Sequence, residues 1–115
     1  MPRVLEGRSI LVVEDEPLIA LDITEVLESA GAVVLTTYTL EHALHAVERP
    51  GIAGAVVDLS LQGGTTSPVC ERLRTRGIPF MVYSGAPADG PCAGPHLRKP
   101  ATPSQLVSAM SDLLR

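Results

Sequence analysis

The sequence is poor in positive charge and contains no long apolar run. Its nine Lys and Arg are outnumbered by thirteen Asp and Glu, so the 115-residue chain has a formal net charge of −4 at pH 7. Because the basic residues also form no continuous run, this balance argues against a nucleic-acid-binding protein. No apolar run approaches the roughly 20 residues that a membrane-spanning helix needs, and the first ten residues lack the apolar core of a signal peptide. We therefore expect a cytoplasmic protein that contacts neither DNA nor membrane.

Cysteine is also scarce. The chain contains Cys70, within a helical pattern, and Cys92, within a segment rich in proline and glycine. Neither needs a disulfide partner, as is usual in a reducing compartment. We expect both to be ordinary thiols with a structural role. An exposed, oxidisable Cys92 is the alternative that its position in a loop leaves open.

Apolar residues, in contrast, make up 45% of the chain, enough for the core of one domain over residues 8–115, with residues 1–7 as an N-terminal extension. Five short segments are apolar on both faces and predict strands of a parallel sheet that is covered on both sides. These are residues 9–14, 32–37, 54–58, 79–83 and 96–99.

Helical patterns separate most of these strands, at residues 17–30, 39–51, 65–77 and 102–115. The alternation predicts an α/β fold, a doubly wound five-stranded parallel sheet with strand order 2-1-3-4-5. Residues 85–95, between the fourth and fifth strands, contain three prolines and three glycines. A regular helix is unfavourable in such a segment, so the fourth helix is expected to be short or absent.

Polar residues stand where the predicted strands end. Glu14 and Asp15 end the first strand, Asp58 the third, Ser84 the fourth and Lys99 the fifth. Since sites in open parallel sheets form at the carboxyl ends of the strands, we expect these five side chains to converge. Clustered carboxylates suit Mg²⁺. A carboxylate nucleophile beside Mg²⁺, a hydroxyl and an ammonium group is an arrangement suited to phosphoryl transfer.

Three other polar residues are expected to lie outside this site. Glu16 adds a favourable charge at a helix N-terminus. His42 and His45 are three residues apart on a predicted helix, but they lack a nearby third ligand for a metal.

The motifs VVEDE, VVDLSL, YSGA and LRKP occur in this order along the chain. On these motifs the sequence resembles the receiver domains of response regulators in two-component signalling, which have a flavodoxin-like fold. It is similar in particular to stand-alone, single-domain receivers with an atypical, short fourth-helix region. The resemblance implies a domain that accepts a phosphoryl group from a histidine kinase or histidine phosphotransferase, changes conformation and contacts an unknown downstream protein. It implies no enzyme activity beyond self-phosphorylation from a phosphodonor and slow autodephosphorylation.

The resemblance also implies a role for each site residue. Asp58 is similar to the phospho-acceptor, Ser84 to the switch hydroxyl and Lys99 to the ion-pair lysine of the family. The implied Mg²⁺ ligands are Glu14 (through water), Asp15, Asp58 and the backbone carbonyl of Ser60. His96 stands where many receivers have a Tyr or Phe that moves on activation. We therefore expect the switch to rest on Ser84 and residues 85–95, with a pH-sensitive His96 as an alternative.

Two other functions fit the same residues. A Mg²⁺-dependent aspartyl-phosphate hydrolase would use Asp58 as its nucleophile, but the sequence lacks a second acid placed to activate water. A degenerate receiver would be a binding module without phosphorylation, but all five site residues are present.

Leu18 and Leu21 lie more than about 100° from the apolar stripe of the first helix. We expect them to be exposed and to form a docking surface for the kinase.

Overall fold

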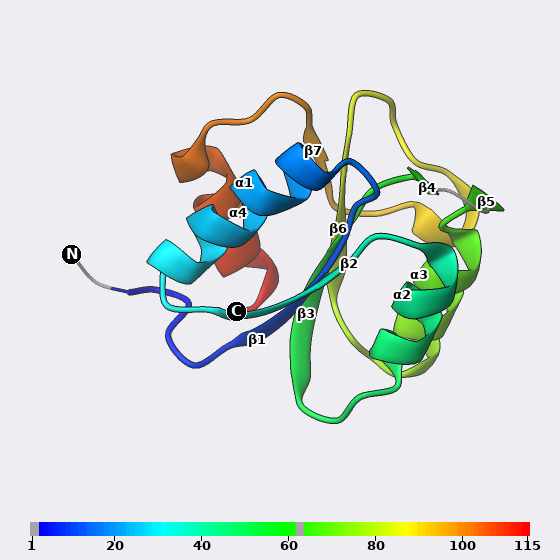
Figure 1. Ribbon diagram of the computed structural model, residues 1–115, viewed down its shortest axis with the longest axis horizontal. Coiled ribbons are helices and arrows are strands. Elements are labelled where there is room, and N and C mark those ends of the chain that lie inside the picture. The colour runs from blue at the N-terminus through cyan, green and yellow to red at the C-terminus, as the bar shows by residue number, and fades with distance from the viewer. Residues whose placement is uncertain (1–2, 62–63) are drawn as a thin grey trace.

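The computed structural model describes residues 3–61 and 64–115, and its centre is a parallel sheet. The strand order is β2-β1-β3-β6-β7 (Figure 1), which confirms the predicted order 2-1-3-4-5. The strands are β1 (Ser9–Val13), β2 (Val33–Thr37), β3 (Ile52–Val57), β6 (Phe80–Ser84) and β7 (His96–Arg98).

Two helices cover each face of this sheet. Helices α1 (Pro17–Ser29) and α4 (Pro103–Leu113) lie on one face, and α2 (Leu40–Val47) and α3 (Ser67–Thr75) lie on the other (Figure 1). Side chains alternate along β1, so Ile10 and Val12 join the core cluster under α1 and α4, whereas Leu11 and Val13 join the cluster under α2 and α3. The doubly wound architecture therefore has two separate cores, one on each side of the sheet.

The helices begin where the sequence provides capping groups. The Thr39 hydroxyl accepts a hydrogen bond from the His42 backbone N–H at the start of α2. At α4, Thr102 and Gln105 form a reciprocal capping box, and Pro103 occupies the first turn. These contacts satisfy N–H groups that the first turn of a helix leaves unpaired.

The segment between β6 and β7 contains a single 3-10 turn, η1 (Gly90–Cys92), in place of a fourth helix. This confirms the expectation drawn from its prolines and glycines. A two-stranded antiparallel hairpin, which the sequence patterns did not predict, follows β3; its strands are β4 (Ser60–Leu61) and β5 (Gly64–Thr65).

The prediction that the two cysteines form no disulfide is wrong. Cys70 and Cys92 are joined by a disulfide with a Cα–Cα distance of 5.2 Å. The physical reason is that η1 packs directly on α3, which brings together residues that are 22 positions apart. The alternative of an exposed Cys92 is also wrong, because only 3% of its surface is accessible.

The described residues contain no helix with the length and apolar content needed to cross a bilayer. The longest helix, α1, has 13 residues.

Part of the predicted N-terminal extension belongs to the core. Leu5 is 1% exposed and packs in the cluster under α1 and α4. Its backbone N–H donates to the Ala30 carbonyl at 2.9 Å, and the Gly7 N–H donates to the Gly31 carbonyl at 3.1 Å. Gly31 has a φ of +101°, and a Cβ at this position would come within 2.7 Å of the Glu6 Cα. Glycine at this corner lets the N-terminal segment lie against the end of α1.

We expect Leu5→Ala to lower the free energy of unfolding by about 2–4 kcal/mol, because it removes buried methyl groups from a packed core. The matched control is Val4→Ala, since Val4 is 53% exposed. Chemical denaturation of both variants measures the difference. Equal stability of the two variants would show that residues 1–7 add little to the domain.

Candidate functional site

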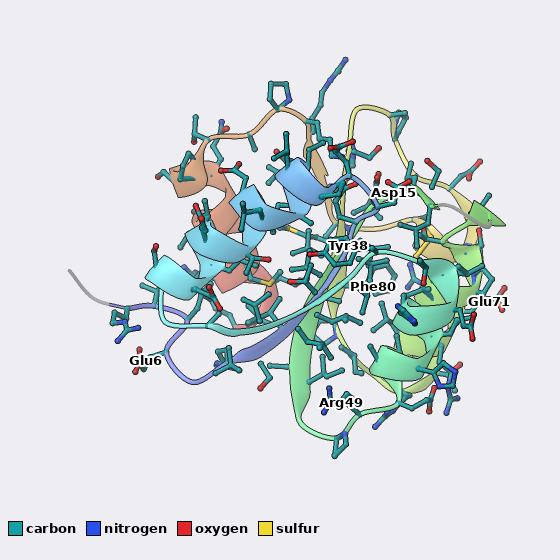
Figure 2. The ribbon with its side chains drawn as sticks, in the orientation of Figure 1. Glu6, Asp15, Tyr38, Arg49, Glu71 and Phe80 are labelled. Atoms are coloured by element: carbon teal, nitrogen blue, oxygen red, sulfur yellow. A yellow bond between two sulfur atoms is a disulfide. The ribbon has the colours of Figure 1, made fainter. Side chains whose placement is uncertain are left out.

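Three carboxylates meet at the carboxyl edge of the sheet. Glu14, Asp15 and Asp58 each contribute one oxygen to a group whose atoms lie within 4.8 Å of one another. β1 and β3 are neighbours, and the Asp58 N–H donates to the Val13 carbonyl at 2.9 Å, so the two strand ends are held in register. Figure 2 shows Asp15 at this edge and Arg49 at the opposite end of the sheet.

Lys99 reaches this cluster from the edge strand. Its Nζ donates to Glu14 Oε1 at 2.8 Å and lies 3.7 Å from Asp58 Oδ2. The Lys99 backbone N–H donates to the Ser84 carbonyl at 3.0 Å, which fixes the residue directly after β7. The structure therefore brings together Glu14, Asp15, Asp58 and Lys99.

The electrostatics of the site follow from burial. The pKa of Glu14 is raised because burial penalises its charged form and Asp58 is close, although Lys99 and the Glu16 N–H act in the opposite direction. For Lys99, burial works to lower the pKa, but the hydrogen bond to Glu14 and the negative charge of Asp58 outweigh it, so the pKa is raised. The ammonium group therefore stays charged and partly offsets the repulsion among the carboxylates.

The three carboxylates differ in their access to solvent. The side chain of Glu14 is 2% exposed, whereas that of Asp58 is 16% exposed, and Asp15 is also partly exposed. Asp58 Oδ1 accepts a hydrogen bond from the Leu59 N–H at 2.8 Å, which orients the carboxylate. Glu14 can influence an incoming group mainly through its charge and through Lys99, while Asp15 and Asp58 can contact it directly.

Ser84 ends β6, the strand between those that precede Asp58 and Lys99, but its hydroxyl is bonded to neither residue. It is 4% exposed, donates to the Ala86 carbonyl at 2.6 Å and accepts from the Ala86 N–H at 3.0 Å. His96 is exposed, and its Nε2 lies 3.2 Å from the Ser84 carbonyl. Ser60, whose backbone carbonyl was expected among the metal ligands, lies exposed in β4, two residues after Asp58.

Sequence reasoning did not identify Thr66, which is hydrogen-bonded to the residue after Asp58 and contacts η1. Thr66 is fully buried, and both its N–H and its hydroxyl donate to the Leu59 carbonyl, at 3.1 and 3.0 Å. Its hydroxyl also lies 3.9 Å from the Cys92 sulfur. The position of Thr66 directly before a Ser-Pro helix start was the available signal. Thr66 therefore links the backbone beside Asp58 to α3 and to η1.

Tyr83 was likewise not identified. Its hydroxyl accepts a hydrogen bond from the Ala101 N–H at 3.2 Å, and its ring centroid lies 5.4 Å from the Lys99 ammonium. The Tyr83 ring therefore interacts with the Lys99 ammonium, and its hydroxyl positions the chain that follows Lys99.

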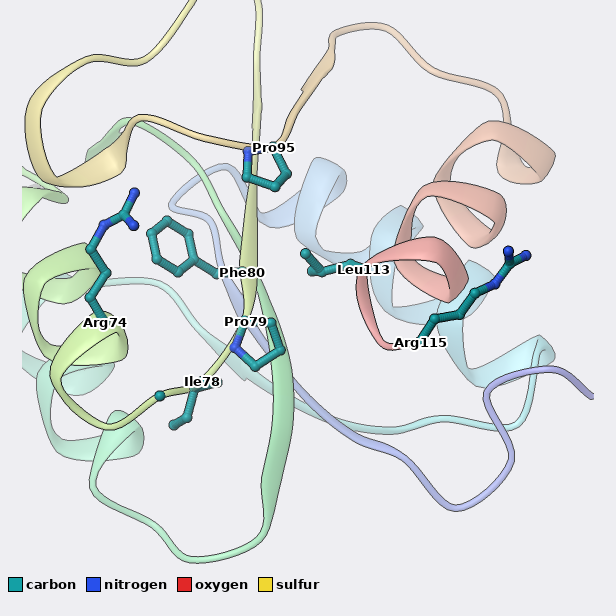
Figure 3. Close-up of a pocket in the computed structure, with 8 residues that line it drawn as sticks. Arg74, Ile78, Pro79, Phe80, Pro95, Leu113 and Arg115 are labelled. Atoms are coloured by element: carbon teal, nitrogen blue, oxygen red, sulfur yellow. The ribbon is translucent and has the colours of Figure 1, made fainter.

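A separate cavity of about 590 Å³ lies at the other end of β6 (Figure 3). Arg74, Phe80, Pro95 and Leu113 are among its lining residues, and it contains none of the predicted site residues.

No family model matches the sequence. A curated relative, the regulatory protein VanR of Enterococcus faecium, is 28% identical over 115 residues, a match that covers 92% of this chain and 49% of VanR. The chain thus spans about half the length of the curated relative that it matches.

Solved structures match over nearly the whole chain. SdrG from Sphingomonas melonis Fr1 is 38% identical with a TM-score of 0.81, over 94% of this chain and 97% of SdrG. A protein of Chloroflexus aurantiacus J-10-fl, described as a response regulator, is 25% identical with a TM-score of 0.82, over 95% of this chain and 98% of that protein.

A third solved structure shares the fold. The receiver domain of the sensor histidine kinase PA1611 from Pseudomonas aeruginosa PAO1 is 21% identical with a TM-score of 0.84, over 94% of this chain and 98% of that domain. It is described with a magnesium ion coordinated in its active-site cleft.

The strand order, the carboxylate cluster beside Lys99 and the similarity to these proteins agree with one another. The chain belongs to the receiver-domain family of response regulators.

Proposed function

We propose that this domain is cytoplasmic and accepts a phosphoryl group on Asp58 from a histidine kinase or histidine phosphotransferase, with Mg²⁺ as cofactor. The observation that carries the proposal is the site itself. Three carboxylate oxygens lie within 4.8 Å of one another, and the Lys99 ammonium lies between Glu14 and Asp58. Such an arrangement concentrates negative charge, which costs stability unless a cation or a reaction makes use of it.

In the proposed reaction, the Asp58 carboxylate attacks the phosphorus of a phosphohistidine. A new O–P bond forms, the N–P bond breaks, and the imidazole leaves with its electron pair and takes up a proton. Lys99 neutralises charge on the phosphoryl oxygens, and the Leu59 N–H keeps the Asp58 carboxylate in its orientation. We expect no turnover of an external substrate beyond this self-phosphorylation and a slow autodephosphorylation.

The donor set fits Mg²⁺. Asp15, Asp58 and the Ser60 carbonyl would hold the ion directly and Glu14 would hold it through water, which agrees with the deeper burial of Glu14. When bound, the ion supplies positive charge to the equatorial oxygens of the phosphoryl group. The magnesium ion described in the active-site cleft of the PA1611 receiver domain supports Mg²⁺ as the cofactor.

The conformational response is proposed to begin at Ser84. Its hydroxyl is now bonded to Ala86, so turning toward a phosphoryl group on Asp58 breaks those two hydrogen bonds and releases Ala86. Residues 85–95 would then shift, and His96 would follow through its contact with the Ser84 carbonyl. The changed surface is what a downstream protein would recognise.

We expect Asp58→Asn to abolish labelling by acetyl phosphate and Mg²⁺ because the amide is not a nucleophile, while the fold is retained. Intact mass spectrometry checks this, with Asp22→Asn on the exposed face of α1 as the control that keeps full labelling. A stable adduct of about one phosphoryl group on the wild type supports a receiver. Continuous phosphate release would support a hydrolase, absence of any adduct would support a degenerate module, and full labelling of Asp58→Asn would contradict the acceptor assignment.

Asp15→Asn should weaken the stabilisation by Mg²⁺. A ligand that binds only the folded state adds ~2.7 kcal/mol at a concentration 100 times its Kd, and most of this gain should be lost in the variant. Without metal, the variant should be at least as stable as the wild type because it relieves carboxylate repulsion. Thermal melts with and without Mg²⁺ measure both effects, again with Asp22→Asn as the control. An equal Mg²⁺ response in Asp15→Asn and wild type would argue against this site.

Leu18 and Leu21 are 75% and 53% exposed, as predicted, and lie at the start of α1 beside the acidic edge. An apolar surface here suits packing against the helices of a kinase. We expect Leu21→Glu to slow transfer from the cognate kinase by at least roughly tenfold, about 1.4 kcal/mol, and to leave acetyl phosphate labelling unchanged. Val33→Glu, at a position that is 61% exposed at the start of β2, is the matched control. Wild-type transfer rates in Leu21→Glu would exclude this docking surface.

A further inference from the structure

The Cys70–Cys92 disulfide joins α3 to the segment that follows Ser84. Cys70 is fully buried in the core cluster under α2 and α3, and Cys92 is 3% exposed in η1. Nothing in the proposed phosphoryl transfer uses either sulfur atom. The bond nevertheless lies between α3 and residues 85–95, the segment whose movement the switch at Ser84 requires.

We propose that Cys70 and Cys92 form a reversible dithiol–disulfide site that exchanges with a dithiol reductant of the thioredoxin class, and that its redox state determines how firmly residues 85–95 are held on α3. The effect on phosphoryl uptake rests on the function proposed above. The effect on the mobility of the segment does not.

The exchange is balanced in electrons and protons. A thiolate of the reductant attacks the Cys92 sulfur, the Cys70–Cys92 bond breaks, and the Cys70 thiolate leaves and takes up a proton. The second thiolate of the reductant then attacks the mixed disulfide, which releases Cys92 as a thiol and leaves the reductant as a disulfide. Two electrons pass to the protein, and the reverse exchange with an oxidised dithiol restores the bond.

The surroundings of Cys92 make such exchange feasible without unfolding the sheet. The backbone hydrogen bonds of η1 are short-range, from the Cys92 N–H to Asp89 and from the Ala93 N–H to Gly90. The sheet holds the segment at its end, where the Pro95 carbonyl accepts from the Val82 N–H. The Arg74 side chain of α3 also holds the segment by donating to the carbonyls of Pro91 and Ala93, and Ala88 packs against the core cluster under α2 and α3. Segments with so little regular structure open at low free energy, and opening here exposes the Cys92 sulfur.

One contact and the chain itself connect this disulfide to the candidate site. Thr66, whose hydroxyl is 3.9 Å from the Cys92 sulfur, also donates to the Leu59 carbonyl beside Asp58. Along the chain, Cys92 lies six residues after Ala86, which is the hydrogen-bond partner of Ser84. The oxidised pair therefore restrains both the backbone after the acceptor and the segment that Ser84 must release. In a reducing compartment, persistent disulfides are unusual and those that form are commonly redox-responsive.

Hydrogen exchange of the oxidised and the dithiothreitol-reduced wild-type protein tests the inference. After reduction, the amides of residues 85–95 should exchange at least ~10-fold faster, and those of β1 and β3 should not change. Cys70→Ala/Cys92→Ala should exchange at the faster rate with or without reductant. Arg74→Ala, which removes the hydrogen bonds to Pro91 and Ala93 but keeps both sulfurs, should still respond to reductant.

Acetyl phosphate labelling of the same samples tests the link to Asp58. The reduced protein and the double variant should be labelled at least ~3-fold faster than the oxidised protein, since they lose the restraint on Ser84. The redox site is excluded if alkylation after oxidation finds two free thiols, if reduction under native conditions fails, or if exchange of residues 85–95 is unchanged in the reduced protein. Absence of labelling in every redox state would instead contradict the proposed function. The hydrogen-exchange rates of residues 85–95 would then still show whether the redox site exists.

Discussion

The ion pair between Lys99 and Glu14 is the contact on which the arrangement of the site depends. Glu14 is almost fully buried, and a carboxylate in that position is unfavourable without a charged partner. Lys99 follows β7 and Glu14 follows β1, and two strands, β3 and β6, lie between them in the sheet. Lys99 can reach Glu14 because all four strands are parallel and their carboxyl ends lie at one edge. Within the described part of the chain, three clustered carboxylates face this one ammonium group, so negative charge remains in excess where Asp15 and Asp58 are accessible.

The segment between β6 and β7 shows how a helix can be replaced. A helix satisfies its own backbone groups, but prolines and glycines prevent this in residues 85–95. Here Arg74 of α3 supplies hydrogen bonds to two carbonyls, and Cys70 of α3 supplies a covalent bond. The conformation of the segment is therefore determined by its neighbour more than by its own propensities.

The difference between what the sequence predicted and what it missed has a physical basis. The strands, the helix starts at Thr39 and Thr102, and the meeting of Glu14, Asp58 and Lys99 follow from local patterns and from general rules of parallel sheets. The burial of Leu5 and the Cys70–Cys92 bond depend on contacts between segments that are distant in the sequence. A local sequence pattern does not predict such contacts. The position of Thr66 before a Ser-Pro helix start indicates only where a helix begins, and its contacts with Leu59 and Cys92 are made with distant segments.

The disulfide also has a topological consequence. Its ends are 22 positions apart, and the whole of β6, including Ser84, lies between them. The oxidised protein therefore contains a covalent ring that includes the interior strand β6 of the sheet. A protease cut at a single bond within residues 85–91 opens the ring but leaves the two polypeptide pieces joined through sulfur. A force applied to the two termini cannot extend the residues inside the ring until the bond is reduced, so the measured contour length of the unfolded chain reports its redox state.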